Sequence, residues 1–209
     1  MDNNRCTELK NQRMDNNQYG SAALARDLDA DVYDFSVVVL EEDRLALEKM
    51  EQRLCRTKPY PAATWEDVVL ICKHHFLELA RRQPHVYVAL KERMADTAQN
   101  WKSTADMIRL RFFQKPKLVD AEDGRFYTDE IIGQQFAWGE NEFPYFLDDG
   151  ISHYLFWMAK RIPDEEIERQ VKDRVPIDCE YVWAPQKVSH MTIPAIFHVQ
   201  VFFRRKKQL

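Results

Sequence analysis

The hydrophobic pattern of the chain changes near residue 115, and this change limits the fold more than any other feature. Before that point, apolar residues recur at helical spacing between breaks at Pro59, Pro84 and Pro116. After it, β-branched and aromatic residues gather in short runs typical of strands. Helices followed by strands indicate the α+β class. The predicted architecture is a helical N-terminal half packed on a small antiparallel sheet formed by the C-terminal half.

Residues 36–114 are predicted to be mainly helical. Thr64 and Asp67 form a capping-box pattern, and Ser103 with Asp106 repeats it. The apolar face of the helix that Thr64 opens is predicted to run along Val68, Val69, Cys72, Phe76 and Leu79. Together with the helical spacing elsewhere in this half, these signals predict a bundle of three or four helices.

Residues 115–203 are predicted to hold strands and one exposed helix. The helix begins at Pro163, has acidic residues in its first turn, and ends near Arg174. The predicted strands are 151–158, 179–183 and 196–203. Residues 126–127 and 131–136 stay ambiguous between strand and loop.

The length fits one folded domain with a short extension at each end. Of the 209 residues, 1–35 are polar and are predicted to be poorly ordered, 36–203 form a single domain, and 204–209 form a basic tail. The net charge of −4 argues against a general nucleic-acid binder. The tail cations Arg204, Arg205, Lys206 and Lys207 are interpreted as a solvated end, with a nuclear address or a phosphate contact as alternatives.

The cysteines and the N-terminal residues favour a cytoplasmic protein, with the nucleus as the alternative that the basic tail allows. None of the four cysteines forms a C-x-x-C pair, so neither a zinc ribbon nor a thiol redox motif is predicted. No signal peptide is predicted, because residues 1–20 are polar, and no membrane span is predicted, because no apolar run reaches the necessary length. We therefore expect no metal, no cofactor and no membrane contact.

Two histidines stand inside predicted strands, His153 and His198. A buried imidazole requires a hydrogen-bond partner. If the two strands are neighbours, both side chains could face one pocket and act as base, acid or ligand near neutral pH. The alternative is that each is bonded to a backbone carbonyl. Before the first of these strands, Glu140, Glu142, Asp148 and Asp149 could receive a cation, or could form a solvated loop rim.

Three separated blocks of the sequence share an order and a spacing with a known family. The first comprises Trp65, Leu79, Arg81 and Tyr87. The second comprises Asn141, Phe143, Pro144, Tyr145, Gly150, Ile151, His153 and Trp157. The third comprises Trp183, Thr192, Ile193, Ile196, His198, Val199 and Val201. Over residues 64–203 the chain thus resembles the N-acetylglucosamine-induced protein family, a domain of unknown function known mainly from fungi.

The resemblance implies site residues but no activity. It marks His153 and His198 as candidate acid/base residues. It implies that the residues that contact a ligand are Asn141, Tyr145, Trp157, Trp183 and Gln200. Thr192 stands where the family usually has Ser, and Gln200 stands where many members have a second His. Because Gln does not titrate, a mechanism that needs two imidazoles on this strand is not expected here.

Two classes of function remain open at this stage. The first is a small-molecule pocket with histidine and aromatic side chains, binding or acting on a phosphorylated or sugar-containing metabolite, with hydrolysis or group transfer as the reaction. The second is a non-enzymatic interaction module whose aromatic motifs are core, with a homodimer formed through an exposed sheet edge. Nucleic acid is expected as a partner only through the basic tail.

Overall fold

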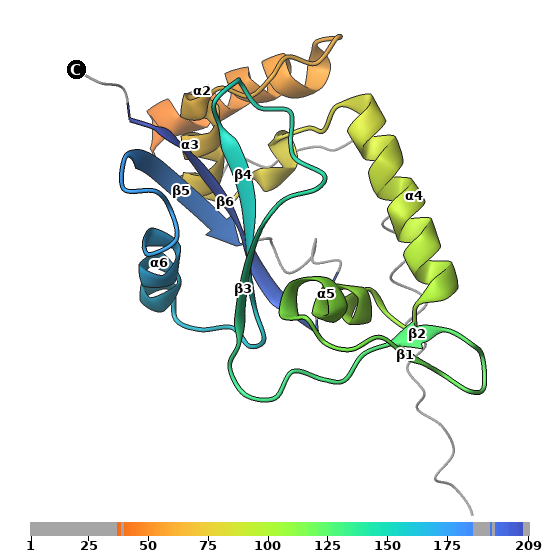
Figure 1. Ribbon diagram of the computed structural model, residues 1–209. Coiled ribbons are helices and arrows are strands. Elements are labelled where there is room, and N and C mark those ends of the chain that lie inside the picture. Colours follow the sequence, from red (N-terminus) through yellow and green to blue (C-terminus); the bar gives the residue numbers. More distant parts are fainter. Residues whose placement is uncertain (1–36, 39, 186–192, 194, 207–209) are drawn as a thin grey trace, which may run out of the picture.

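The computed structural model describes residues 37–38, 40–185, 193 and 195–206 (Figure 1). The helices are α2 (Glu41–Glu51), α3 (Trp65–His74), α4 (Pro84–Asn100), α5 (Thr104–Phe113) and α6 (Asp164–Lys172), with a π-helical turn at Gln52–Arg56 and a 3-10 turn at Leu77–Leu79. The strands are β1 (Leu118–Val119), β2 (Phe126–Tyr127), β3 (Phe136–Glu140), β4 (Ser152–Met158), β5 (Cys179–Pro185) and β6 (Phe197–Arg205). The predicted N-terminal segment 1–35 lies outside the described residues, and so does Lys207.

The predicted helix starts are confirmed. The N–H of Asp67 donates to the Thr64 hydroxyl at 3.2 Å, and the Thr64 N–H donates to the Asp67 carboxylate at 2.7 Å, which completes the capping box of α3. The prediction that the apolar face of this helix runs on through Phe76 and Leu79 is wrong. Helix α3 ends at His74 because His75 takes a left-handed conformation with a φ of 58°.

The main sheet has four antiparallel strands in the order β3-β4-β6-β5. Its three C-terminal strands were predicted within about two residues. The ambiguous residues at 126–127 form the small β1–β2 hairpin, and β3 begins only at Phe136. Strand β6 continues to Arg205, two residues beyond the predicted domain end, so the first half of the basic tail belongs to the sheet.

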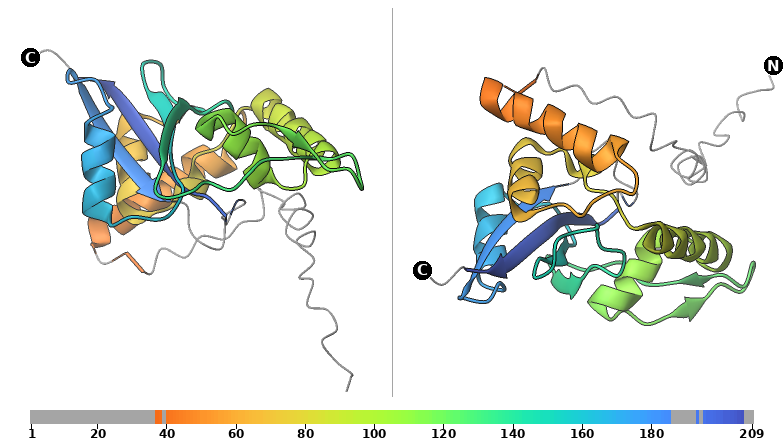
Figure 2. Two further views of the ribbon diagram at one scale, coloured as in Figure 1. Left: turned by 60° about the horizontal axis from the view of Figure 1, so that its bottom comes forward. Right: turned by 90° about the horizontal axis from the view of Figure 1, so that it is seen from above.

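Helices cover both faces of the sheet (Figure 2). On one face, the buried side chains of Ala184 and Phe202 pack with α2 and α3, and those of Leu155 and Trp157 pack with α5. On the opposite face, α6 lies on the alternate residues of β4 and β6. The α+β class is therefore confirmed, with α6 as a second helical layer. Along the described residues, no helix combines the length and the apolar character needed to cross a bilayer.

Gly139 of β3 allows α5 to approach the sheet. A Cβ at this position would lie 2.7 Å from the ring of Phe112. We expect Gly139→Ala to lower the free energy of unfolding by about 1–3 kcal/mol, since overpacking forces side chains to shift. In a Phe112→Ala background the same substitution should cost less than about 0.5 kcal/mol. Urea denaturation of the four proteins measures both values, and an equal cost in both backgrounds would contradict the steric explanation.

Candidate functional site

Two family-motif residues of β4, His153 and Trp157, lie on the same face of the sheet as three residues of β6, namely His198, Gln200 and Phe202. The register places His153 opposite Phe202, Leu155 opposite Gln200, and Trp157 opposite His198. Side chains alternate along each strand, so His153, Gln200 and His198 all point to the face that α3 and α5 cover. The structure thus brings both histidines to one side of the sheet. Gln200, two residues after His198 on β6, lies between them on this face.

His153 is surrounded by hydrogen-bond partners. The main-chain N–H of Tyr145 donates to its Nδ1 at 3.2 Å, and its Nε2 lies 2.6 Å from Oε1 of Gln200. Because Nδ1 accepts, the proton of the neutral ring belongs on Nε2 and is donated to Gln200. Asn141 Nδ2 also lies 3.2 Å from Nε2, but two N–H groups cannot bond to each other, so this contact is one of packing.

The His153 ring is enclosed by two aromatic rings. Its centroid lies 4.9 Å from that of Tyr145 and 4.4 Å from that of Phe202. Only 4% of the residue is exposed. Burial lowers the pKa of His153 from 6.5 to about 3, and the hydrogen bond to Gln200 opposes this only in part. The imidazole is therefore neutral at physiological pH, with both nitrogens engaged, which suits a structural support better than a proton carrier.

The network around His153 holds the loop that joins β3 to β4. Oδ1 of Asn141 accepts the N–H of Phe143 at 3.0 Å, while the main-chain N–H of Asn141 donates to the carbonyl of His153 at 2.9 Å. Arg82 donates to the carbonyl of Phe143 at 2.8 Å, and its guanidinium lies 4.7 Å from the Tyr145 ring centroid. These contacts fix the first half of the loop.

The second half of the loop is tied to the start of α3. The N–H of Ala63 donates to the carbonyl of Phe146, and the N–H of Asp148 donates to the carbonyl of Ala63, both at 2.9 Å. Gly150 then has a φ of +84°, a conformation that glycine adopts without steric penalty. The family-motif residues from Asn141 to His153 thus hold this loop beside α3.

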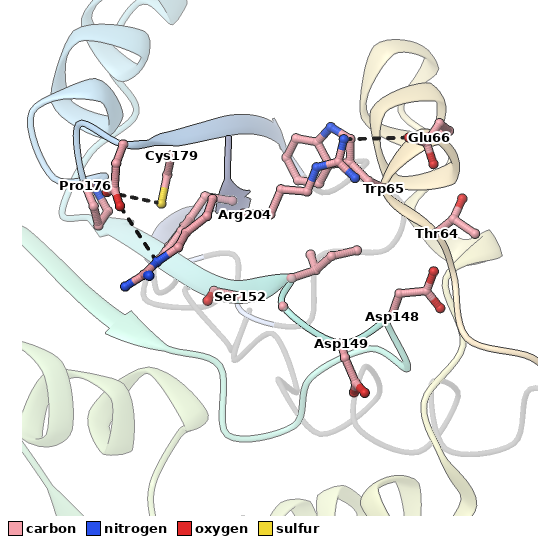
Figure 3. Close-up of a pocket in the computed structure, with 14 residues that line it drawn as sticks. Thr64, Trp65, Glu66, Asp148, Asp149, Ser152, Pro176, Cys179 and Arg204 are labelled. Atoms are coloured by element: carbon pink, nitrogen blue, oxygen red, sulfur yellow. Dashed lines mark hydrogen bonds and ion pairs between the residues drawn. The ribbon is translucent and has the colours of Figure 1, made fainter. Parts of the chain in front are cut away.

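A cleft of about 710 Å³ lies where the loop, α3 and the ends of β5 and β6 meet (Figure 3). We call it the α3 cleft. It is lined by Thr64, Trp65 and Glu66, by residues 148–152, by Pro176, Asp178 and Cys179, and by Phe203, Arg204 and Arg205. One signal for it is visible in the sequence, the acidic pair Asp148 and Asp149. The contributions of Glu66 and Arg204 were missed.

The cations of the α3 cleft are already paired. Nε of Arg204 donates to Glu180 at 2.7 Å, a second nitrogen lies 3.7 Å from Glu66, and the guanidinium lies 4.8 Å from the Trp65 ring centroid. Arg205 lies 3.7 Å from the carboxylate of Asp178. Asp148 and Asp149 are exposed and form no ion pair within the described part of the chain. The unpaired charge of the cleft is therefore negative.

The second histidine is placed differently. The His198 and Trp157 rings lie 4.4 Å apart, and both residues are buried. Nδ1 of His198 and Nε1 of Trp157 have no hydrogen-bond partner among the described residues. Burial lowers the pKa of His198 from 6.5 to about 4. A buried polar group without a partner costs about 1–3 kcal/mol, so this pair requires an explanation of its own.

Trp183 does not join the other candidate residues. It lies opposite Val201 on the α6 face of the sheet, and its indole N–H donates to Glu168 at 2.6 Å. The Tyr181 hydroxyl donates to the other carboxylate oxygen of Glu168. Trp183 thus fastens α6 to the edge strand. Among the described residues, no three His, Cys, Asp or Glu side chains gather closely enough to hold a metal ion.

The fold and the loop network define a small α+β domain of a known sequence family. The chain belongs to the N-acetylglucosamine-induced protein family, whose model, described as "Protein of unknown function (DUF3605)", matches residues 64–204. No curated protein matches the chain. A solved structure titled "Crystal Structure of HTC1" is similar with a TM-score of 0.48 and 16% identity, over 70% of this chain and 87% of that one.

Proposed function

We propose that the protein binds a small, hydroxyl-rich molecule such as a sugar in the α3 cleft. The observation that supports this is the part of the chain that the hydrogen bonds of the family-motif residues hold in place. Its hydrogen bonds run from His153 and Asn141 to the loop whose far end, Asp148 to Ile151, forms one wall of the cleft. A preformed concave site with a few fixed polar groups is the usual form of a small-molecule site.

The charges of the cleft favour a sugar over a phosphorylated metabolite. Carboxylate oxygens accept hydrogen bonds from hydroxyl groups, and Asp148 and Asp149 are free to do so. A phosphate group would meet their negative charge. The Arg204 guanidinium that could receive it is held by Glu180, and the exposed Arg205 lies beside the Asp178 carboxylate. The ion pairs of Arg204 and Arg205 therefore support a neutral sugar rather than a phosphorylated one as the proposed ligand.

Binding without catalysis fits the lining residues. The cleft contains no histidine among its described residues. The pKa of the Cys179 thiol is raised, chiefly by burial and then by the neighbouring Asp178 carboxylate. A thiol with a raised pKa is a poor nucleophile. The proposal therefore includes no chemical step.

A thermal-shift screen tests the proposal. The panel pairs neutral sugars with their 6-phosphates, and the protein is compared with Asp148→Asn/Asp149→Asn and with the control Asp129→Asn, an exposed carboxylate outside the cleft. A sugar at 100 times its Kd should stabilise the protein by about 2.7 kcal/mol, a rise in Tm of several degrees. We expect this rise in the wild type and the control, a smaller one with the phosphate, and none in the double variant. No shift with any sugar would contradict the proposal.

A homodimer through β5 is the second candidate, and the edge position of this strand favours it. Within the described residues, β5 pairs with β6 on one side only, and it is seven residues long. Unpaired strand edges can pair with a second copy. Sedimentation equilibrium over a range of concentrations should then give a dimer mass, with slow amide exchange in β5. A monomer at every concentration would contradict this candidate.

A further inference from the structure

Two neighbouring rings on the sheet face that α5 covers each carry an unpartnered polar atom. Trp157 is 3% exposed and His198 is 7% exposed. Within the described part of the chain, Nε1 of Trp157 and Nδ1 of His198 both lack a hydrogen-bond partner, and the two rings are in contact, with centroids 4.4 Å apart. Buried polar groups in folded proteins nearly always have a partner, in the protein or in a bound molecule. Two adjacent exceptions indicate a common cause.

Among the described residues, none bonds to Nε1 of Trp157 or Nδ1 of His198. The buried apolar side chains that pack with Trp157 are Ala105, Ile108, Ala137, Leu155, Ile193 and Ile196. The Phe112 ring lies 5.3 Å from the Trp157 ring and adds a further apolar wall. The printed hydrogen bond of the Gln200 side chain goes to His153, which lies on β4 four residues before Trp157. The partner of these two nitrogen atoms is therefore not one of the described side chains.

The chemistry of the two atoms restricts what can bind them. The indole Nε1–H of Trp157 can only donate. Burial keeps the His198 ring uncharged, and a neutral ring whose proton is on Nε2 presents Nδ1 as an acceptor. A single oxygen that accepts one hydrogen bond and donates another satisfies both atoms. A hydroxyl oxygen has this property, whereas a carbonyl or a phosphate oxygen without a proton does not.

We infer that Trp157 and His198 form a buried site for one hydroxyl oxygen, which accepts from the indole N–H and donates to Nδ1 of His198. The oxygen belongs either to one internal water molecule or to the hydroxyl group of an alcohol-type ligand. Buried waters commonly satisfy otherwise unpaired polar groups in this way. The residues of this site do not line the α3 cleft, so a test of the site is independent of the proposed function.

Nuclear magnetic resonance of the 15N-labelled protein tests the inference without a destabilising substitution. The indole signal of Trp157 is assigned by through-bond experiments. The nitrogen shifts of His198 report which ring nitrogen carries the proton. We expect the proton on Nε2 and a magnetisation transfer from long-lived water to the Trp157 indole proton in buffer alone. The Trp183 indole, bonded to Glu168 at a partly exposed position, is the internal control and should show exchange with bulk water only.

The two sources of the oxygen give different results. An internal water gives the transfer in buffer, and added methanol or glycerol leaves the Trp157 signal unchanged. A ligand hydroxyl gives no transfer in buffer, and methanol or glycerol shifts the Trp157 signal in a saturable manner while the Trp183 signal stays in place. A His198 proton on Nδ1 would overturn the inference. So would the absence of both the water transfer and the alcohol-induced shift.

Discussion

Replacing His153 with alanine should lower the free energy of unfolding by about 3–5 kcal/mol, the range found when a buried ring is truncated. The variant loses a ring that packs between Tyr145 and Phe202. It also leaves the Tyr145 N–H and the Gln200 side chain without their partner, and each unpaired group adds to the loss. Chemical denaturation measures the change directly, and Tm should fall by roughly 10 °C.

The matched control is His85→Ala, at an exposed position near the start of α4. Exposed substitutions of this kind usually change stability by no more than about 0.5 kcal/mol. If His153→Ala were as stable as the wild type and had lost ligand binding, the histidine would act on the ligand itself. A stable variant of that kind would overturn the structural role given to His153.

Stability should fall steeply as the pH drops from about 6.5 to about 4.5. In the folded protein, burial lowers the pKa of His153 from 6.5 to about 3 and that of His198 from 6.5 to about 4. In the unfolded chain, both rings take up a proton near pH 6.5. The unfolded state thus binds more protons over this interval. The contribution that the two neutral histidines make to stability is therefore complete above pH 6.5 and is lost progressively as the pH falls below it.

Each histidine should contribute a loss of about 2–3 kcal/mol by pH 4.5, because one pKa unit corresponds to about 1.36 kcal/mol. Urea denaturation at a series of pH values gives the slope. His198→Gln should have a shallower slope than the wild type, and His85→Gln should have the same slope. Equal slopes in all three proteins would mean that His198 takes up its proton at the same pH in the folded and the unfolded state, which would contradict the lowered pKa.

The sequence was sufficient for the elements whose signals are local. The capping box at Thr64 and Asp67 marked the start of α3, and the alternation from Ile196 to Phe203 marked β6. It failed where the deciding interaction is not local. Strand β3 contains Gly139, a weak strand former, and exists because it pairs with β4 and receives the Phe112 ring.

The site was only partly predictable for the same reason. Alternation along β6 placed His198, Gln200 and Phe202 on one face, but only the register with β4 brings Gln200 to His153. Trp183 was assigned to the same pocket through the family resemblance, and its single strand does not reveal which face of the sheet meets which helices. The α3 cleft joins residues more than a hundred positions apart, such as Trp65 and Arg204, and no local pattern could show that contact.

The hydrogen bonds around His153 and Asn141 hold the loop that forms one wall of the α3 cleft. Hydrogen exchange of Asn141→Ala, read by mass spectrometry, measures this role of the loop. Asn141 binds the loop through the N–H of Phe143. We expect faster exchange confined to residues 143–150 and to Ala63, together with weaker sugar binding. Unchanged exchange in this loop, with sugar binding lost, would contradict it and would place Asn141 in contact with the ligand.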